Sequence, residues 1–297
     1  MSRLQQRIRD GKFVITAEIV PPLAASAEPL LAEAKLLGPR VDAINVTDAA
    51  AGRTTMSSFA SAAILKANGY EPILQVTCRD RNRIALAGDL LGAAAQGIEN
   101  MLLLRGDDPK GGDQPDATPV FDFETADLMK LAKDMRDDGV LPSGRKIDSP
   151  PKFFIGGADI PRVPDEKWSP EPLRKKIAGG ANFFQTQFCF DLDVARQYFD
   201  RLAEEGITEQ VGVIIGVGPI RSAKSARWMN ENLFGVHVPE ATIARLEGAK
   251  DQAAEGRAIC VELIEGLRDM PGPAGAHLMA PAQGPQAIAD VLGALRD

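Results

Sequence analysis

The sequence predicts an α/β fold, a (β/α)8 TIM barrel with an extra helical segment before the last strand, on three observations. Short β-type runs alternate with helix-type segments, a pattern typical of a parallel sheet. Eight segments of each kind occur, which is the number that closes such a barrel. A further helical segment, at residues 239–268, comes before the last strand-like run. Residues 1–297 are therefore expected to form a single barrel domain.

The bounds of the expected elements follow from hydrophobic periodicity. Short apolar runs between turn residues predict strands, and longer stretches with apolar residues three or four positions apart predict helices. The expected strands are residues 13–18, 42–47, 72–77, 100–105, 152–157, 182–187, 210–217 and 276–280. The expected helices are residues 27–37, 56–68, 82–97, 123–138, 170–179, 192–205, 221–233 and 284–296.

Charge and hydropathy exclude several classes of partner. The formal net charge is −7 and no basic stripe is visible, so nucleic acid is not expected as a partner. The N-terminal residues 1–12 are polar and charged, and no apolar run is long enough to span a bilayer. Neither a signal peptide nor a membrane partner is expected, and the sequence predicts a cytoplasmic protein.

The few cysteines and histidines limit the chemistry further. Cys78, Cys189 and Cys260 are widely spaced, which favours buried thiols over a zinc site. Only two histidines exist, His237 and His277, so a zinc site of three histidines is excluded. No metal is expected, and general acid–base chemistry must fall mainly on carboxylates.

Glu18 is the first of several polar residues that stand where expected strands end. The active site of a TIM barrel lies at the carboxyl ends of its strands, so such residues are candidates for one common site. Apolar residues flank Glu18 and two prolines follow. Partial desolvation would raise the pKa of its carboxyl, which suits a proton donor. The alternative is a solvated loop carboxylate without a catalytic role.

Three further strand-end or helix-end groups are candidates for ligand binding. In Arg105-Gly106-Asp107 the glycine lets a ligand approach the backbone, the arginine can meet a phosphate or a flavin carbonyl, and the aspartate can accept from an amino-pyrimidine. The alternative is an Arg–Asp ion pair that closes the rim. The Gln187 amide both donates and accepts, which suits heterocycle edges. Lys176 ends a helix, where it either binds a ligand or complements the helix dipole.

Six short motifs follow one another along the chain. They are Ala17-Glu18-Ile19-Val20-Pro21-Pro22, Asn45-Val46-Thr47-Asp48, Gln75-Val76-Thr77-Cys78-Arg79-Asp80, Leu104-Arg105-Gly106-Asp107, Ala178-Gly179-Gly180-Ala181-Asn182 and Thr186-Gln187-Phe188-Cys189-Phe190-Asp191. In order and spacing they resemble the methylenetetrahydrofolate reductase family over the first seven expected strands. The chain is most similar to the short bacterial catalytic unit of that family, without a regulatory domain.

The resemblance implies reduction of 5,10-methylenetetrahydrofolate to 5-methyltetrahydrofolate, with FAD relaying a hydride from NADH or NADPH. Glu18 matches the family's general acid, which opens the imidazolidine ring of the folate. Asp107 matches a catalytic carboxylate that binds the pterin beside the flavin. Gln187 matches an amide shared by folate and nicotinamide, and Thr47 lies in the nicotinamide position. Ser225 and Gln283 are further expected substrate-binding residues, with Gln283 in place of an arginine.

The expected flavin contacts combine matches with departures from the family. Asp48 and Gln75 replace the Tyr and His of the enterobacterial form, and residues 157–162 lack the Tyr and His that the family often carries there. Two polar flavin-binding residues on the next helix align with Ser169 and Pro172. FAD is therefore expected to bind loosely. The expected cofactor-binding residues are Asp48, Ala50, Gln75, Arg105, Gly106, Asp107, Ala158, Arg162 and Lys176.

Three alternatives remain open. One is direct hydride transfer from the nicotinamide without a flavin. The others are a folate-dependent methyltransferase or lyase on the same barrel, and a folate-binding subunit that accepts electrons from a separate chain. The set Glu18, Asp107 and Gln187 favours the reductase. The choice between NADH and NADPH stays open, as does a homo-oligomer.

Overall fold

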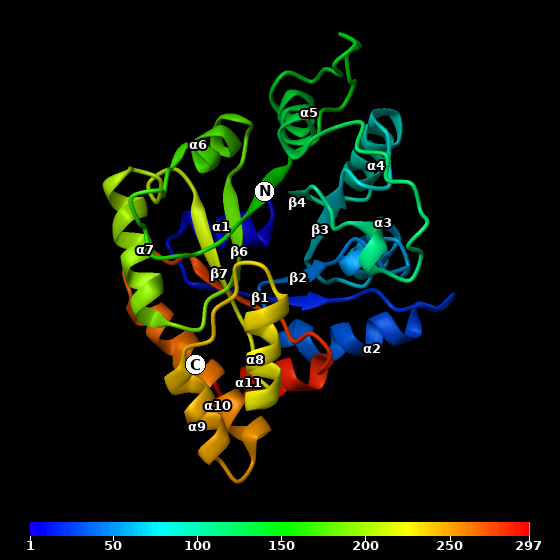
Figure 1. The fold of residues 1–297 in the computed structure, drawn as a ribbon. Coiled ribbons are helices and arrows are strands. Elements are labelled where there is room, and N and C mark those ends of the chain that lie inside the picture. The colour runs from blue at the N-terminus through cyan, green and yellow to red at the C-terminus, as the bar shows by residue number, and fades with distance from the viewer. Residues whose placement is uncertain (297) are drawn as a thin grey trace.

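The computed structural model describes residues 1–296 and contains a closed barrel of eight parallel strands in the order β1 to β8 (Figure 1). The strands are β1 (Val14–Ile19), β2 (Ala43–Val46), β3 (Pro72–Thr77), β4 (Asn100–Leu104), β5 (Phe154–Asp159), β6 (Phe183–Phe188), β7 (Gly212–Val217) and β8 (Gly275–Leu278). The helices are α1 (Arg3–Arg9), α2 (Glu28–Leu37), α3 (Ser58–Ala67), α4 (Arg83–Ala95), α5 (Thr125–Asp137), α6 (Glu171–Ala178), α7 (Leu192–Glu204), α8 (Ala223–Asn232), α9 (Glu240–Gly248), α10 (Gln252–Asp269) and α11 (Pro285–Ala294). Three 3₁₀ turns are η1 (Gly38–Arg40), η2 (Ala50–Gly52) and η3 (Pro109–Gly111). The predicted (β/α)8 TIM barrel is confirmed.

Two helical features differ from the sequence prediction. The extra segment before β8 is two helices, because α9 ends at Gly248 and Asp251 starts a new helix. The Asp251 side chain caps α10 by accepting a hydrogen bond from the Ala254 amide at 3.0 Å. Near the N-terminus, a segment for which no helix was expected forms α1, with Ser2 as its N-cap.

The floor of the barrel is apolar, and α1 closes it from below. Leu4 of α1 is fully buried against the first inward-facing residues of the strands. Two of these, Phe154 and Phe183, stack with ring centroids 5.0 Å apart. Burial of Leu4 therefore explains why a short, charged segment is held as a helix. The cluster consists of Leu4, Val14, Ala43, Ile73, Leu102, Phe154, Phe183 and Ile214.

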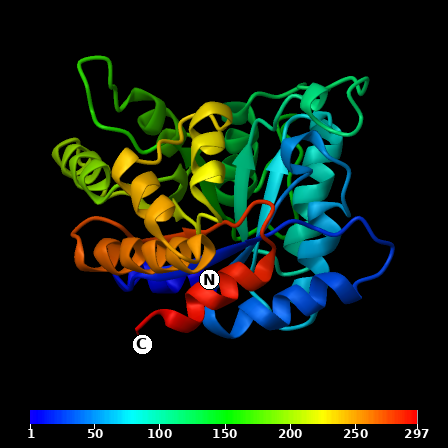
Figure 2. The same cartoon turned by 60° about the horizontal axis from the view of Figure 1, so that its bottom comes forward.

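Outward-facing strand residues form a second, larger core with the surrounding helices. The last helix, α11, lies beside α2, so the helical ring closes on itself (Figure 2). Cys78, Cys189 and Cys260 are all buried and carry free thiols, as the sequence predicted.

Side chains alternate along each strand, and this alternation places the site. On the inner face of β1, Val14 is followed by Thr16 and then by Glu18. On β2, Ala43 is followed by Asn45, and Thr47 comes directly after the strand. The interior thus changes from apolar at the floor to polar at the carboxyl ends of the strands, where the active sites of TIM barrels lie.

Candidate active site

Glu18 is the carboxylate at the mouth of the barrel, one residue before the end of β1. Its side chain is 20% exposed, and burial raises its pKa from 4.5 to about 7. Near neutral pH a carboxyl with this pKa is protonated in about half of the molecules. Glu18 can therefore donate a proton, as the sequence-based role requires.

His277 lies inside the barrel next to Glu18, on β8. Its Nε2 atom is 4.0 Å from Glu18 Oε2, and its Nδ1 atom is 2.9 Å from the Thr16 hydroxyl. The Asn45 amide nitrogen lies 3.4 Å from Nε2. Burial lowers the pKa of His277 to about 3, so the imidazole is neutral at physiological pH.

Three polar atoms in the barrel interior are without a hydrogen-bond partner among residues 1–296. They are Asn45 Oδ1, Thr47 Oγ1 and Gln185 Oε1. The other end of the Gln185 amide donates to the Thr16 hydroxyl at 3.3 Å. Because buried polar atoms are usually hydrogen-bonded, this cluster above the apolar floor is a candidate set of contacts for a polar ligand.

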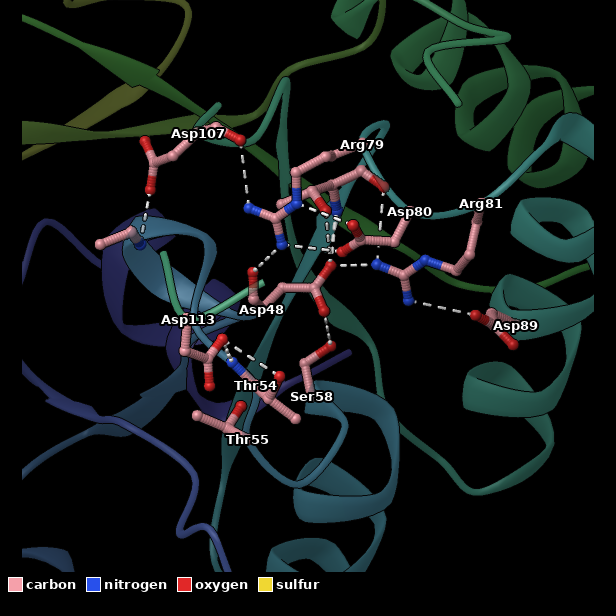
Figure 3. A network of polar contacts seen from close by, with 12 residues as sticks. Asp48, Thr54, Thr55, Ser58, Arg79, Asp80, Arg81, Asp89, Asp107 and Asp113 are labelled. Carbon is pink, nitrogen blue, oxygen red and sulfur yellow. Dashed lines mark hydrogen bonds and ion pairs between the residues drawn. The ribbon is translucent and has the colours of Figure 1, made fainter. Parts of the chain in front are cut away.

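The Asp48 carboxylate is fully engaged within the protein (Figure 3). One oxygen accepts from the Ser58 hydroxyl at 2.9 Å, and the other accepts from the Thr77 amide at 2.8 Å and from the Thr77 hydroxyl at 2.9 Å. Arg81 pairs with the same carboxylate. Asp48 therefore ties the end of β2 to β3 and α3, and its side chain is committed to this network. Gln75, also buried, lies two residues before Thr77 on β3.

The Arg105-Gly106-Asp107 segment follows β4. Gly106 has a φ of +92°, and a Cβ there would lie 3.0 Å from Cβ of both Thr77 and Arg79, so only glycine fits without strain. Asp107 is exposed, and its Oδ2 atom accepts from the Ala51 amide at 2.7 Å. Its other carboxylate oxygen accepts no hydrogen bond within residues 1–296.

Arg105 is exposed and does not pair with Asp107, so the alternative of an Arg–Asp pair across this turn is not what the structure contains. Its guanidinium lies 4.1 Å from the centre of the Phe121 ring and 3.7 Å from Glu124. Exposed pairs of this kind contribute little stability, so the guanidinium can turn to an anionic ligand.

The loop after β2 contains Ala50 in the 3₁₀ turn η2. Ala49 and Ala51 on either side have φ angles of 49° and 54°, in the left-handed region that costs energy for alanine. A cavity of about 380 Å³ opens between this loop and those after β3 and β4, with Arg53 and Thr54 in its lining.

Lys176 on α6 contacts the end of β5, where its Nζ atom donates to the carbonyl of Ala158 at 2.5 Å. Burial lowers the pKa of Lys176. Neighbouring Asp159 is half-buried and accepts from the Tyr198 hydroxyl, and desolvation raises the pKa of its carboxyl. Arg162, further along the same loop, is exposed.

The remaining predicted residues lie in the loops after β6, β7 and β8. The Gln187 amide accepts from the Phe188 amide at 3.0 Å and donates to the Phe234 carbonyl at 3.4 Å, which leaves one N–H and one lone pair. Ser225 forms a capping box with Ser222 at the start of α8. The Gln283 amide nitrogen donates to the Pro219 carbonyl at 2.7 Å and so joins the last two of these loops.

The predicted residues therefore fall into separate contact groups. Glu18 contacts His277, Asp107 contacts the loop that carries Ala50, and Lys176 contacts Ala158. Within residues 1–296 no helix has the length and apolar character needed to cross a bilayer, and no group of His, Cys, Asp or Glu residues is arranged to bind a metal ion.

The closed eight-stranded barrel places this chain among the TIM-barrel proteins, whose sites lie at the carboxyl ends of the strands, where Glu18 also lies. Within that class, the sequence profile of the methylenetetrahydrofolate reductases matches residues 3–280. The chain belongs to the methylenetetrahydrofolate reductase family.

Individual relatives agree with this assignment. The 5,10-methylenetetrahydrofolate reductase of Salmonella typhimurium is 26% identical over 275 residues, which cover 87% of this chain and 85% of the relative. A probable methylenetetrahydrofolate reductase (NADPH) of Caenorhabditis elegans is 27% identical over 76% of this chain, which spans only 32% of that relative. An uncharacterized protein from Clostridium thermocellum that binds two copies of 5-methyl-5,6,7,8-tetrahydrofolic acid shares the fold, with a TM-score of 0.66 over 98% of both chains at 17% identity.

Proposed function

We propose that this protein reduces 5,10-methylenetetrahydrofolate to 5-methyltetrahydrofolate with a hydride from NADH or NADPH and with FAD as the bound hydride carrier. The observation that carries the proposal is Glu18, whose pKa of about 7 suits a general acid at the mouth of the barrel. Membership of the reductase family supports the reaction class.

In this proposal Glu18 donates a proton to a nitrogen of the imidazolidine ring, and ring opening gives an iminium that accepts the hydride. Asp107 and Gln187 bind the pterin. The free Asp107 oxygen accepts from the ring amino group, and the remaining N–H and lone pair of Gln187 meet a donor and an acceptor on the ring. Gln283 keeps its amide oxygen for the folate, whereas the Ser225 hydroxyl would have to leave its capping box to take part.

The residues around the mouth fit a nicotinamide and a flavin in part. The buried Thr47 hydroxyl lacks a protein partner among residues 1–296, which suits a nicotinamide amide. Arg105 and Arg162 offer exposed guanidinium groups for a diphosphate. When bound, FAD supplies hydride relay between nicotinamide and folate. Any flavin contact of Asp48 would come from its main chain, because its carboxylate is already bonded.

One observation favours a second candidate, direct hydride transfer without a flavin. Lys176, an expected flavin contact, donates instead to the Ala158 carbonyl and is partly desolvated. Asp48 is likewise engaged elsewhere. Each lost hydrogen bond to a charged diphosphate weakens binding by about 1.5–3 kcal/mol, so FAD is expected to be held loosely.

The purified protein tests both candidates. We expect NADH- or NADPH-dependent conversion of 5,10-methylenetetrahydrofolate, stimulated by added FAD, and a flavin spectrum that is partly lost on purification. Full activity without detectable or added flavin would select the direct route. Absence of folate reduction with either nucleotide, with and without FAD, would refute the proposed function.

A further inference from the structure

Arg79 has a buried guanidinium that joins three consecutive strand ends (Figure 3). It follows β3 and its side chain is only 3% exposed. Its Nη1 atom donates to the main-chain carbonyl of Asp107, after β4, at 3.3 Å. Its Nη2 atom donates to the carbonyl of Asp48, after β2, at 3.4 Å. The side chain therefore fixes the two loops on either side of its own strand.

Asp80 balances the charge of this buried group. Its two carboxylate oxygens accept from Nε and Nη2 of Arg79, both at 2.7 Å, in a bidentate pair. A buried guanidinium without such a partner would be strongly destabilising. The Asp80 side chain is itself 48% exposed, so the positive charge of Arg79 is balanced from the solvent side. The hydrogen bonds to the two carbonyls come from Nη1 and Nη2 of the same guanidinium.

The two loops that Arg79 holds also brace each other. Asp48 directly precedes Ala49, and the loop continues through Ala51, both with left-handed backbone conformations. Such alanines persist only where neighbouring contacts hold them. The contact here is the bond from the Ala51 amide to Asp107 Oδ2 at 2.7 Å. Arg79 thus anchors the main chain at Asp107 itself and at Asp48, three residues before Ala51, in the two loops that the bond to the Asp107 carboxylate joins.

The packing around this bond leaves little freedom. Gly106 provides the space for Arg79, since a Cβ at that position would lie 3.0 Å from Arg79 Cβ. Lysine could not replace Arg79, because one ammonium group cannot donate to two carbonyls and to both carboxylate oxygens of Asp80 at once.

We propose that Arg79 is a positioning residue that sets the orientation of the Asp107 carboxylate toward its ligand. The ligand part of this inference rests on the proposed role of Asp107 in pterin binding. Arg79 itself touches no substrate in this scheme, and it acts through the carbonyls of Asp48 and Asp107.

Hydrogen exchange of the Ala51 amide tests the orientation without any folate. Ala51 is exposed, so Asp107 is the acceptor that protects this amide. We expect Arg79→Lys to speed its exchange about tenfold or more, as Asp107→Ala should, when followed by NMR. Arg83→Lys is the matched control, because Arg83 makes a similar bidentate pair with Asp122 at the surface. Unchanged Ala51 exchange in Arg79→Lys would overturn the proposal.

A double-mutant cycle tests the link to the ligand, with 5-methyltetrahydrofolate as the probe. Arg79→Lys should raise its Kd about tenfold in the native background and leave it unchanged in the Asp107→Ala background, because coupled residues are not additive. Equal effects in both backgrounds would refute a role through Asp107. If the native protein does not bind the probe, the proposed function fails, and Ala51 exchange still decides the role of Arg79.

A second variant guards against loss of folding. Asp80→Asn keeps the size of the side chain but removes the charge that balances Arg79. Asp80→Asn should also speed Ala51 exchange, by a smaller factor than Arg79→Lys. In the Asp107→Ala background it should cause no further increase in the Ala51 exchange rate. If Arg79→Lys does not fold, unchanged Ala51 exchange in Asp80→Asn would overturn the proposal.

Discussion

Replacing Glu18 with glutamine should remove one pH-dependent contribution to the stability of the protein, so the stability difference between the variant and the native protein should change with pH. In the folded protein the pKa of Glu18 is about 7, against 4.5 for a solvated glutamate. The folded state therefore binds the proton more tightly than the unfolded state. This contribution is fully present below pH 4.5 and is lost as pH rises through 7, where an ionised carboxylate must stay desolvated. Glutamine has nearly the same shape and carries no titrating proton.

The magnitude follows from the two pKa values. Their difference of about 2.5 corresponds to about 3 kcal/mol at alkaline pH. Between pH 5.5 and 8.5, the advantage of Glu18→Gln over the native protein should grow by about 2 kcal/mol. Urea unfolding followed by circular dichroism at both pH values measures it. Glu231→Gln, at an exposed position on α8, is the control and should show no such growth.

A stability advantage of Glu18→Gln over the native protein that is the same at both pH values would refute the desolvation argument.

The same variant also tests the role of Glu18 in catalysis. Folate reduction should fall by about 100-fold or more, because glutamine cannot donate the proton. Reduction of any bound flavin by the nicotinamide should remain. Near-normal folate turnover in the variant would remove Glu18 from the role of general acid.

Three further measurements follow from the structure. Asp107→Ala should weaken folate binding by about 1–3 kcal/mol in calorimetry, because a polar group of the ligand is left unpaired, and an unchanged Kd would reject its binding role. Titration of apo-protein with FAD should give a saturable change in flavin fluorescence below about 100 μM, the range expected after loss of two or three diphosphate contacts, and a flat titration with intact folate reduction would favour the flavin-free route. Leu4→Ala should lower the free energy of unfolding by about 2–5 kcal/mol by opening a cavity in the barrel floor, and an unchanged urea midpoint would show that α1 does not support the barrel.

The barrel could be predicted because its strands and helices carry local patterns. Each strand is an apolar run that ends in turn residues, and the order of strands in a barrel follows the order in the chain. Helix α1 was missed because its sequence holds one fully buried residue, Leu4, among several charged ones. The burial of Leu4 depends on a floor built from seven separate strands, and no local pattern reports it.

The positions of candidate site residues could be predicted from the sequence where the residue stands at the end of its own strand. Glu18 stands out because apolar neighbours surround a single carboxylate. The hydrogen bonds that the Asp48 carboxylate accepts from Ser58 and Thr77 could not be predicted from the sequence, since they join separate elements of the fold. The contacts of Arg79 with the neighbouring loops could not be predicted from its motif, because they are made to main-chain carbonyls that any residue could offer. The inward direction of His277 could not be predicted, since it depends on the register that pairs it with Thr16 of β1.

The neutral state of His277 explains how Glu18 can keep its proton near pH 7. A protonated imidazole at 4.0 Å from the Glu18 carboxylate would attract it by about 4 kcal/mol at an effective dielectric of 20. That is worth about three pKa units, more than the rise from 4.5 to about 7 that burial gives. Because burial also lowers the pKa of His277 to about 3, the imidazole stays uncharged and the opposing effect is absent. Desolvation thus acts on both groups in the direction that leaves a proton on Glu18.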